Sequence, residues 1–471
     1  MTRFARLCAS AICCALLPLA VASGATGVKL PAYQSATLAN GALVVLVEKR
    51  DTPLVSMSVT VRGGALGDPA GKDGTASLLA DLMQRGAGTR DAAQFAAAIE
   101  NAGGVLTAGA GTESLGVSAS FLARDVDLML ELVADALQRP RLDAVEFDKA
   151  RTLAVQSIVA AKDSDPRRLI GSYGDAWLFR DHPYGRPVGG SESSLAAVSL
   201  EDLKRYYADQ LGGDRLIIVV VGDIDSAAMM KKLEQSFGNW RKAAAAVPAV
   251  AAPERVSGRR VLLVDKPGAT QTYFWLGNVG ASRTDPARTS QSVVNTVFGG
   301  RFTSMLNTEL RIKSGLTYGA RAAFNRSSQP GAFSIASYTE TGTTTQAIDL
   351  ALETLARLHK DGLDAGQLES SQNYILGQFP PTLETSGQIA ARLADMLFYG
   401  LGPEDVNEYA DRVAKVDVAA VRSTIAQSFP QPENLVIVLI GDAAKIRDAV
   451  KKYGPVTEMK IGDPQFAPVG K

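Results

Sequence analysis

The strongest constraint on the fold is an internal duplication, because the chain passes twice through the same order of predicted elements. In each half two strands come first, then two helical stretches, an alternating strand and long amphipathic helices. The paired predictions are strands 43–48, 54–62 and 115–121 with helices 75–85 and 91–102, and strands 261–264, 271–276 and 331–338 with helices 289–298 and 302–312. Such a repeat predicts two related domains in one chain.

Short sequence segments inside the halves, and the sequences near the end of each half, repeat as well. The run that begins DVDLMLEL at Asp125 resembles the run AIDLALET at Ala347, and each reaches a Leu-Asp-Ala triplet. The halves close with RLIIVVVGD at 215–223 and NLVIVLIGD at 434–442, and such continuous β-branched runs are typical of strands buried on both faces. We therefore expect an α+β fold in which each domain is a mostly antiparallel sheet with helices packed on one face.

The boundary between the halves follows from composition. Residues 241–260 are dominated in their centre by Ala, Val and Pro, which offers no periodic face and predicts a semi-extended linker. The predicted domains are therefore 30–240 and 261–460. Lys plus Arg and Asp plus Glu both number 49, a balance that argues against a general nucleic-acid binder.

Residues 1–22 have the features of a signal peptide. Arg3 and Arg6 precede an apolar stretch that ends in Ala20-Val21-Ala22, a small-x-small cleavage signal. All three cysteines lie inside this segment, so the expected mature chain, from Ser23, has no thiol for a disulfide, a metal site or a nucleophile. The sequence predicts a periplasmic or secreted protein with no membrane span after cleavage.

Several common chemistries fail on inspection. Residues 67–72 lack the spacing and the Ser or Thr of a phosphate-binding loop, and 189–193 lack the second glycine of a nucleophile elbow. The chain has two histidines, His182 in a Pro/Gly-rich loop and His359 near a predicted helix end. Both are interpreted as structural, since a zinc site usually needs three or four His, Cys or carboxylate ligands.

Taken with the duplication, two motifs carry a family resemblance. They are HPYGRP at 182–187 and LRIKSGLTYG at 310–319. With them the chain resembles the pitrilysin, insulysin and mitochondrial processing peptidase family over about residues 30–460. The resemblance implies a two-domain chain that forms half of a clamshell.

Active members of that family carry H-x-x-E-H on the first long helix, with two zinc-binding histidines and a glutamate base, and a further glutamate ligand downstream. The matching positions here are Ser77 and Asp81 for the histidines, Ala80 for the base and Ser157 for the third ligand. A supporting acidic position is Ala150. The resemblance therefore implies no metal or other cofactor on this chain.

The second half keeps a pair of residues that the family uses. Arg311 and Tyr318 have the seven-residue spacing of an Arg and a Tyr that hold the substrate backbone and stabilise the oxyanion of the scissile carbonyl. The alternative is that Arg311 is a solvated helix residue and Tyr318 a strand residue of the core.

Some family members are split into two chains, one with the zinc motif and the other with the Arg/Tyr pair. The resemblance therefore implies a non-zinc subunit that contributes to peptide cleavage only with a zinc-bearing homologous partner. An inert structural or peptide-binding scaffold is the competing hypothesis. A self-sufficient hydrolase with an unrecognised site is a weaker one.

Overall fold

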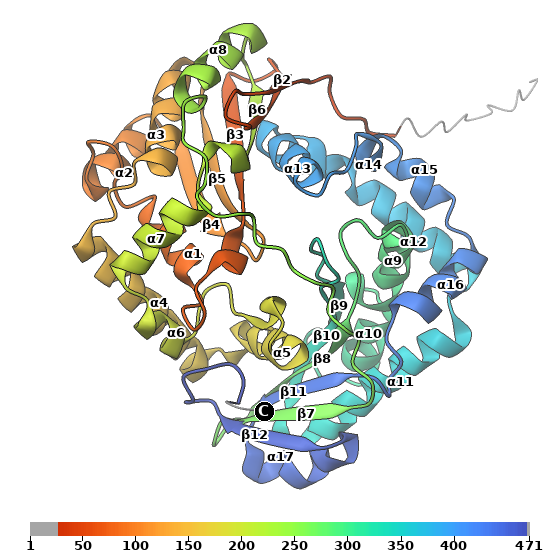
Figure 1. Cartoon of the computed structure of the whole chain (residues 1–471). Coiled ribbons are helices and arrows are strands. Elements are labelled where there is room, and N and C mark those ends of the chain that lie inside the picture. The colour runs from red at the N-terminus through yellow and green to blue at the C-terminus, as the bar shows by residue number, and fades with distance from the viewer. Residues whose placement is uncertain (1–26, 469–471) are drawn as a thin grey trace, which may run out of the picture.

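The computed structural model describes residues 27–468, so the predicted signal peptide and its cysteines lie outside the described residues. Two six-stranded sheets organise the chain, one from each half (Figure 1). The first sheet has the order β1-β2-β6-β3-β5-β4 and the second the order β12-β7-β11-β8-β10-β9. The strands are β1 (Gln34–Thr37), β2 (Leu43–Glu48), β3 (Leu54–Arg62), β4 (Val105–Ala110), β5 (Ser114–Leu122), β6 (Leu216–Gly222), β7 (Arg260–Asp265), β8 (Gln271–Val279), β9 (Arg321–Phe324), β10 (Ala332–Glu340), β11 (Val436–Gly441) and β12 (Val456–Lys460).

The two sheets confirm the duplication. Strands β2, β6, β3, β5 and β4 occupy the same places as β7, β11, β8, β10 and β9. In each sheet the buried strand near the end of the half, β6 or β11, pairs in parallel with β2 or β7 and in antiparallel with β3 or β8. The outermost strand differs, because β1 precedes β2 and pairs with it in antiparallel, whereas β12 follows β11 and pairs with β7 in parallel.

One face of each sheet is covered by helices from the same half of the chain. In the first half they are α1 (Thr75–Leu82), α2 (Ala92–Asn101), α3 (Val126–Gln138), α4 (Ala144–Ser164), α6 (Glu192–Ala197), α7 (Leu200–Gln210) and α8 (Ser226–Phe237). In the second half they are α9 (Arg288–Asn295), α10 (Met305–Asn307), α11 (Thr344–Asp361), α12 (Ala365–Gln378), α15 (Tyr409–Ala414), α16 (Val418–Ser428) and α17 (Ala443–Val450), with the short α14 (Glu404–Asn407) beside them. Side-chain caps begin many of them, such as the capping box of Asp91 and Gln94 at α2.

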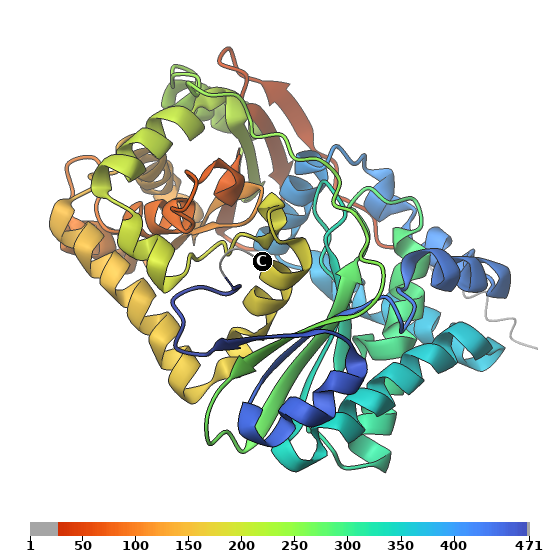
Figure 2. The ribbon, with the colours of Figure 1, turned by 60° about the horizontal axis from the view of Figure 1, so that its bottom comes forward.

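The second face of each sheet is covered by a helix from the other half. Helix α13 (Ser386–Phe398) lies on β3 and β6, and helix α5 (Ile170–Phe179) lies on β8 and β11 (Figures 1 and 2). This explains why β6 and β11 are buried along their whole length. Alternate residues of β6 face the two sides: Ile218 packs with the helices of its own half, whereas Ile217 packs with Leu393 of α13. We call this arrangement the helix exchange.

A close approach positions α5 on the second sheet. Gly174 of α5 lies directly over the indole ring of Trp275 in β8, which is 3% exposed. A Cβ atom at Gly174 would stand 2.6 Å from that ring, closer than real carbon atoms approach. The backbone of α5 can therefore reach the sheet only because residue 174 has no side chain.

The segment that joins the sheets has no helix or strand between residues 241 and 259. It is nevertheless held along its length: Arg215 donates to the carbonyl of Ala245 at 2.6 Å, and Asn278 bonds both the N–H and the carbonyl of Val256 at 2.9 Å. After β12 the chain returns to the first half, where Lys162 donates to the carbonyl of Asp463 at 2.6 Å (Figure 2).

Two features differ from the sequence-based expectations. The helix predicted at 302–312 begins at Met305, because the Ser304 side chain caps it, and it widens into a π-helix at Thr308–Lys313. The short strands β1, β4, β9 and β12 were not predicted. All four lie at or next to a sheet edge and are partly exposed, so their hydrophobic alternation is weak.

Candidate functional site

Helix α1 carries three of the four positions at which the resemblance expects zinc chemistry. The Asp68 carboxylate accepts hydrogen bonds from the backbone N–H groups of Gly74 and Ala76, both at 2.8 Å, and so fixes the start of this helix. Ser77 is half-buried and Ala80 is buried against the core. Of these two side chains only Ser77 has a polar group, which is a single hydroxyl. Neither is a good zinc ligand or a general base.

Asp81, the remaining carboxylate on α1, is neutralised within the protein. Arg85, one helical turn further on, contacts it at 3.1 Å and also reaches Glu146 of α4 at 3.5 Å. The hydrogen bond to Asp81 is the main reason that the pKa of Arg85 is raised. The guanidinium uses the lone pairs of Asp81 and places a fixed positive charge where a metal would bind, so this arrangement opposes a divalent cation.

Helix α4 packs beside α1 and carries the fourth position. Ser157 is exposed on it, whereas Ala150, the supporting position, is buried. The fold therefore brings the four substituted positions to two adjacent helices. Among residues 27–468 there is no group of three His, Cys, Asp or Glu side chains that could hold a metal ion.

Both histidines make hydrogen bonds that suit a structural role. His182 caps a short turn by accepting from the N–H of Tyr184, and its Nε2 bonds the carbonyl of Ala251 at 2.9 Å. His359 contacts the carbonyl of Pro430 at 3.1 Å, and burial lowers its pKa. They lie in different halves of the chain, beside the joining segment and in α11.

Arg311 lies in the π-helix that follows α10. Its guanidinium stacks on the ring of Phe302, with 4.7 Å between Cζ and the ring centroid. Phe302 is itself 58% exposed, and within the described part of the chain Arg311 makes no ion pair. Short π-helices occur frequently at functional sites, because the wider turn re-aims side chains. The donors of Arg311 therefore remain available to a ligand.

Tyr318 lies in the loop between that π-helix and β9 and is 76% exposed, so the core-packing alternative for this residue is wrong. The loop is nevertheless fixed, because Thr317 before it and Ala320 after it are buried. Ser337 donates to the carbonyl of Gly319 at 2.9 Å, and Ala320 donates to the side chain of Asn307 at 2.8 Å. The phenol of Tyr318 is therefore exposed on a fixed backbone, where its O–H can donate to a bound ligand.

A groove of about 520 Å³ lies directly beside this loop. The second half lines it with Gly319, Ala320, Arg321 and the outer part of β10, and the first half contributes the turn between α4 and α5. The turn adds Arg167 and Arg168, so the groove presents several cationic donors along with backbone amides. A groove of this size and polarity can accommodate a few residues of an extended peptide.

We expect no stoichiometric zinc on the isolated chain. The base and the ligands are replaced by Ser77, Ala80 and Ser157, and Asp81 is held by Arg85. Elemental analysis of the purified, dialysed protein makes this measurement. One tightly bound zinc per chain would contradict the expectation and would direct attention to His182 and His359.

The two halves match separate family models. A model described as insulinase (peptidase family M16) matches residues 43–192, and one described as peptidase M16 inactive domain matches residues 197–375. Together the matches run from β2 into α12.

Similar proteins have bacterial sources. A zinc protease of Mycobacterium leprae is 28% identical over 389 residues, covering 82% of this chain and 87% of the relative. A non-peptidase homologue, YmxG of Helicobacter pylori, is 23% identical over 74% of this chain and 80% of its own length. The solved structure of a peptidase M16 inactive domain from Pseudomonas fluorescens has a TM-score of 0.81 at 22% identity, covering 87% of this chain and 98% of that one.

Proposed function

The chain belongs to the M16 (insulinase) peptidase family, and we propose that it is the non-zinc subunit of an exported, heterodimeric peptidase. The observation that carries the proposal is the contrast between its two halves. Helix α1 has lost the chemistry of water activation, whereas Arg311 is half-buried and makes no ion pair among the described residues, and Tyr318 is exposed on a loop next to a groove of peptide size. A purely structural protein would have no need of that second arrangement.

In this proposal Arg311 and Tyr318 have two roles in peptide cleavage. The guanidinium of Arg311 can bind a main-chain carbonyl of the substrate, since its stacking on Phe302 leaves its N–H groups free. The phenol of Tyr318 can donate to the oxygen of the scissile carbonyl as negative charge grows there. The zinc of the partner chain supplies the activated water, and this chain holds the substrate.

Exposed apolar side chains of this protein support an interface with a second chain. Phe302 and Ile312 are more than half exposed around Arg311, and Val145, Leu153 and Val159 are exposed along α4. Apolar side chains on a helix surface are costly to leave in water, and a homologous chain facing them would remove that cost. The relative named as mitochondrial-processing peptidase subunit beta, from Lentinula edodes, is a subunit by its own name and supports a paired assembly.

Mixing tests this proposal. The isolated chain is expected to show no peptidase activity, and adding a purified M16 homologue that carries H-x-x-E-H is expected to produce cleavage of short peptides. The partner alone and the chelated mixture are the controls. Chelator-insensitive activity from this chain by itself would refute the half-site. A stable pair whose activity equals that of the zinc-bearing chain alone would favour the inert scaffold.

Export is the remaining part of the proposal and follows from residues 1–22. The protein found outside the cytoplasm is expected to begin at Ser23, which Edman sequencing or mass spectrometry of its N-terminal peptide would detect. An intact Met1 terminus in a cytoplasmic pool would overturn this prediction. Among the described residues no helix is both long and apolar enough to cross a bilayer.

A further inference from the structure

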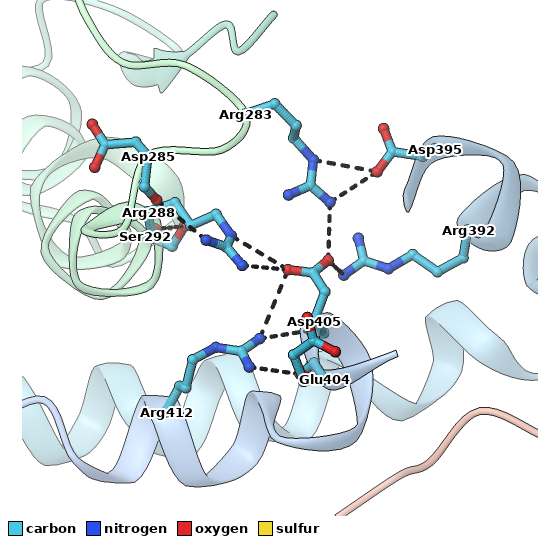
Figure 3. Close-up of polar contacts among 9 residues, drawn as sticks. All are labelled: Arg283, Asp285, Arg288, Ser292, Arg392, Asp395, Glu404, Asp405 and Arg412. Carbon is cyan, nitrogen blue, oxygen red and sulfur yellow. Dashed lines mark hydrogen bonds and ion pairs between the residues drawn. The ribbon is translucent and has the colours of Figure 1, made fainter. Parts of the chain in front are cut away.

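A cluster of arginines surrounds one buried carboxylate in the second half. Asp405, at the start of α14, has a side chain that is 4% exposed. Arg288 and Arg392 contact it at 2.8 Å, Arg283 at 3.1 Å and Arg412 at 3.8 Å (Figure 3). These guanidinium groups come from the loop after β8, from α9, from α13 and from α15.

The same arginines line a pocket of about 400 Å³. Arg283, Arg288 and Arg392 are joined there by Arg326, from the loop after β9. In the described part of the chain Arg326 makes no ion pair; it donates to the side-chain oxygen of Gln291 at 3.0 Å and stacks on Phe324. Hydroxyl groups complete the wall, from Thr289, Ser292, Thr382 and Tyr409.

Positive charge is in excess in this pocket. The carboxylates of Asp405 and of Asp395, which pairs with Arg283 at 2.8 Å, contact four of these five arginines, and Arg326 contacts neither. Burial alone would raise the pKa of Asp405, but the hydrogen bond from Arg288 and the charges of Arg392 and Arg283 bring it below its usual range. Burial, with the charge of Arg283, lowers the pKa of Arg326 to about 10, so its guanidinium stays charged at neutral pH.

Several buried donors in this cluster have no partner. The Nε–H groups of Arg326, Arg392 and Arg412 are buried and make no hydrogen bond among the described residues. A buried charged donor without an acceptor is costly, and native proteins rarely retain several together. A structural tether through Asp405 accounts for the four arginines that touch it. It leaves Arg326 and the excess charge unexplained.

We propose that this pocket binds a multiply charged oxyanion of the phosphate class. Guanidinium groups bind phosphate through two parallel hydrogen bonds, and several converging arginines favour a dianion over a single carboxylate. Thr289 and Ser292 of α9 also line the pocket, and the Asp285 carboxylate at the start of this helix accepts from the N–H of Ala287 at 2.7 Å. The site is independent of Arg311, Tyr318 and the proposed peptidase function.

The position of the pocket in the fold implies that a bound ligand would stabilise the whole chain. Arg392 belongs to α13, the second-half helix that crosses to the first sheet, whereas Arg288 lies on α9 and Arg326 in the loop after β9. Asp405 already links Arg392 to Arg288, and a bound anion would add Arg326 to this link and offset the repulsion between the guanidinium groups. Binding is therefore expected to raise the melting temperature of the whole chain.

Calorimetric titration of the mature chain in chloride buffer tests the proposal, with inorganic phosphate and pyrophosphate as probes and glucose 6-phosphate as a phosphorylated small molecule. We expect one site per chain and a higher melting temperature with the bound probe. Preference for glucose 6-phosphate over both inorganic ions would assign the site to a phosphorylated metabolite; the reverse order would assign it to the free ion. Malonate at the same ionic strength controls for carboxylates, and binding equal to that of phosphate would overturn the class.

Variants of Arg326 separate binding from structure. Arg326→Gln is expected to weaken binding at least about tenfold; the melting temperature in chloride should fall only by the loss of the hydrogen bond to Gln291 and of the stacking on Phe324, because among the described residues Arg326 has no ion pair to lose. Arg326→Lys keeps the charge but not the two parallel hydrogen bonds and should lie between. Arg447→Gln on α17 is the matched control: it removes an exposed ion pair with Glu458 of β12 and should bind as wild type. Equal affinity in wild type and Arg326→Gln, or no binding by wild type, would refute the site.

Discussion

Tyr318→Phe is expected to slow peptide cleavage by the reconstituted heterodimer by about 10²–10³-fold, which is the usual consequence of removing one oxyanion donor. The ring of Tyr318 is 76% exposed and its loop is held by backbone contacts, so loss of the hydroxyl should leave the fold unchanged. Arg311→Ala removes a charged donor and should slow cleavage at least as much. Part of that loss should be seen as a higher KM if Arg311 also binds the ground-state substrate.

Matched variants on the same half control for general damage. Tyr374→Phe removes a phenol that is also exposed, on α12, and Arg422→Ala removes an exposed guanidinium on α16. Both should cleave at the wild-type rate with unchanged melting temperatures. Wild-type turnover in Tyr318→Phe and Arg311→Ala together would leave the chain as a scaffold, even if the heterodimer forms.

Gly174→Ala should destabilise the chain by about 1–3 kcal/mol, because the new methyl group would press on the Trp275 ring. Trp275 is buried, and the space around it is occupied by the second sheet, so the ring has little room to move. The result should be a lower melting temperature for the whole chain and not for one half, since α5 joins the first half to the second sheet. Differential scanning calorimetry or urea unfolding measures it.

The same helix supplies the control. Gly171 lies one turn earlier in α5, and a Cβ atom there would meet nothing within 4 Å. Gly171→Ala should therefore stabilise the helix by up to about 1 kcal/mol, since alanine loses less backbone entropy than glycine. If both substitutions shift stability in the same direction and to the same extent, α5 does not lie on Trp275 as described.

The duplication could be predicted from sequence because it is written in local patterns. The strands β2 and β3 have the predicted bounds, since alternating or continuous apolar runs determine a strand without reference to its neighbours. The runs at β6 and β11 also showed correctly that both faces are buried. They could not show what buries them, because α13 is remote from β6 in the chain and α5 is remote from β11.

The candidate site likewise has a part that the sequence could predict and a part that it could not. The family resemblance predicts the loss of two zinc ligands at Ser77 and Asp81 and of the base at Ala80 from their places along one helix, and this stays a prediction. Asp81 and Arg85 are four residues apart, so their ion pair is local in the chain, whereas the contact of Arg85 with Glu146 needs the packing of α1 on α4. The arginine pocket was missed entirely, because its residues come from separate loops and helices and no short stretch of sequence contains more than two of its arginines.

The helix exchange also has a consequence for the order of folding. When β6 leaves the ribosome or an export channel, α13, which covers its second face, has not yet emerged. That face of β6 therefore stays uncovered until residues 386–398 follow. Contacts between such distant segments slow folding and keep apolar strands exposed in the meantime. The first half should therefore be the region that needs protection from aggregation during biogenesis, although it is complete in sequence long before the second half arrives.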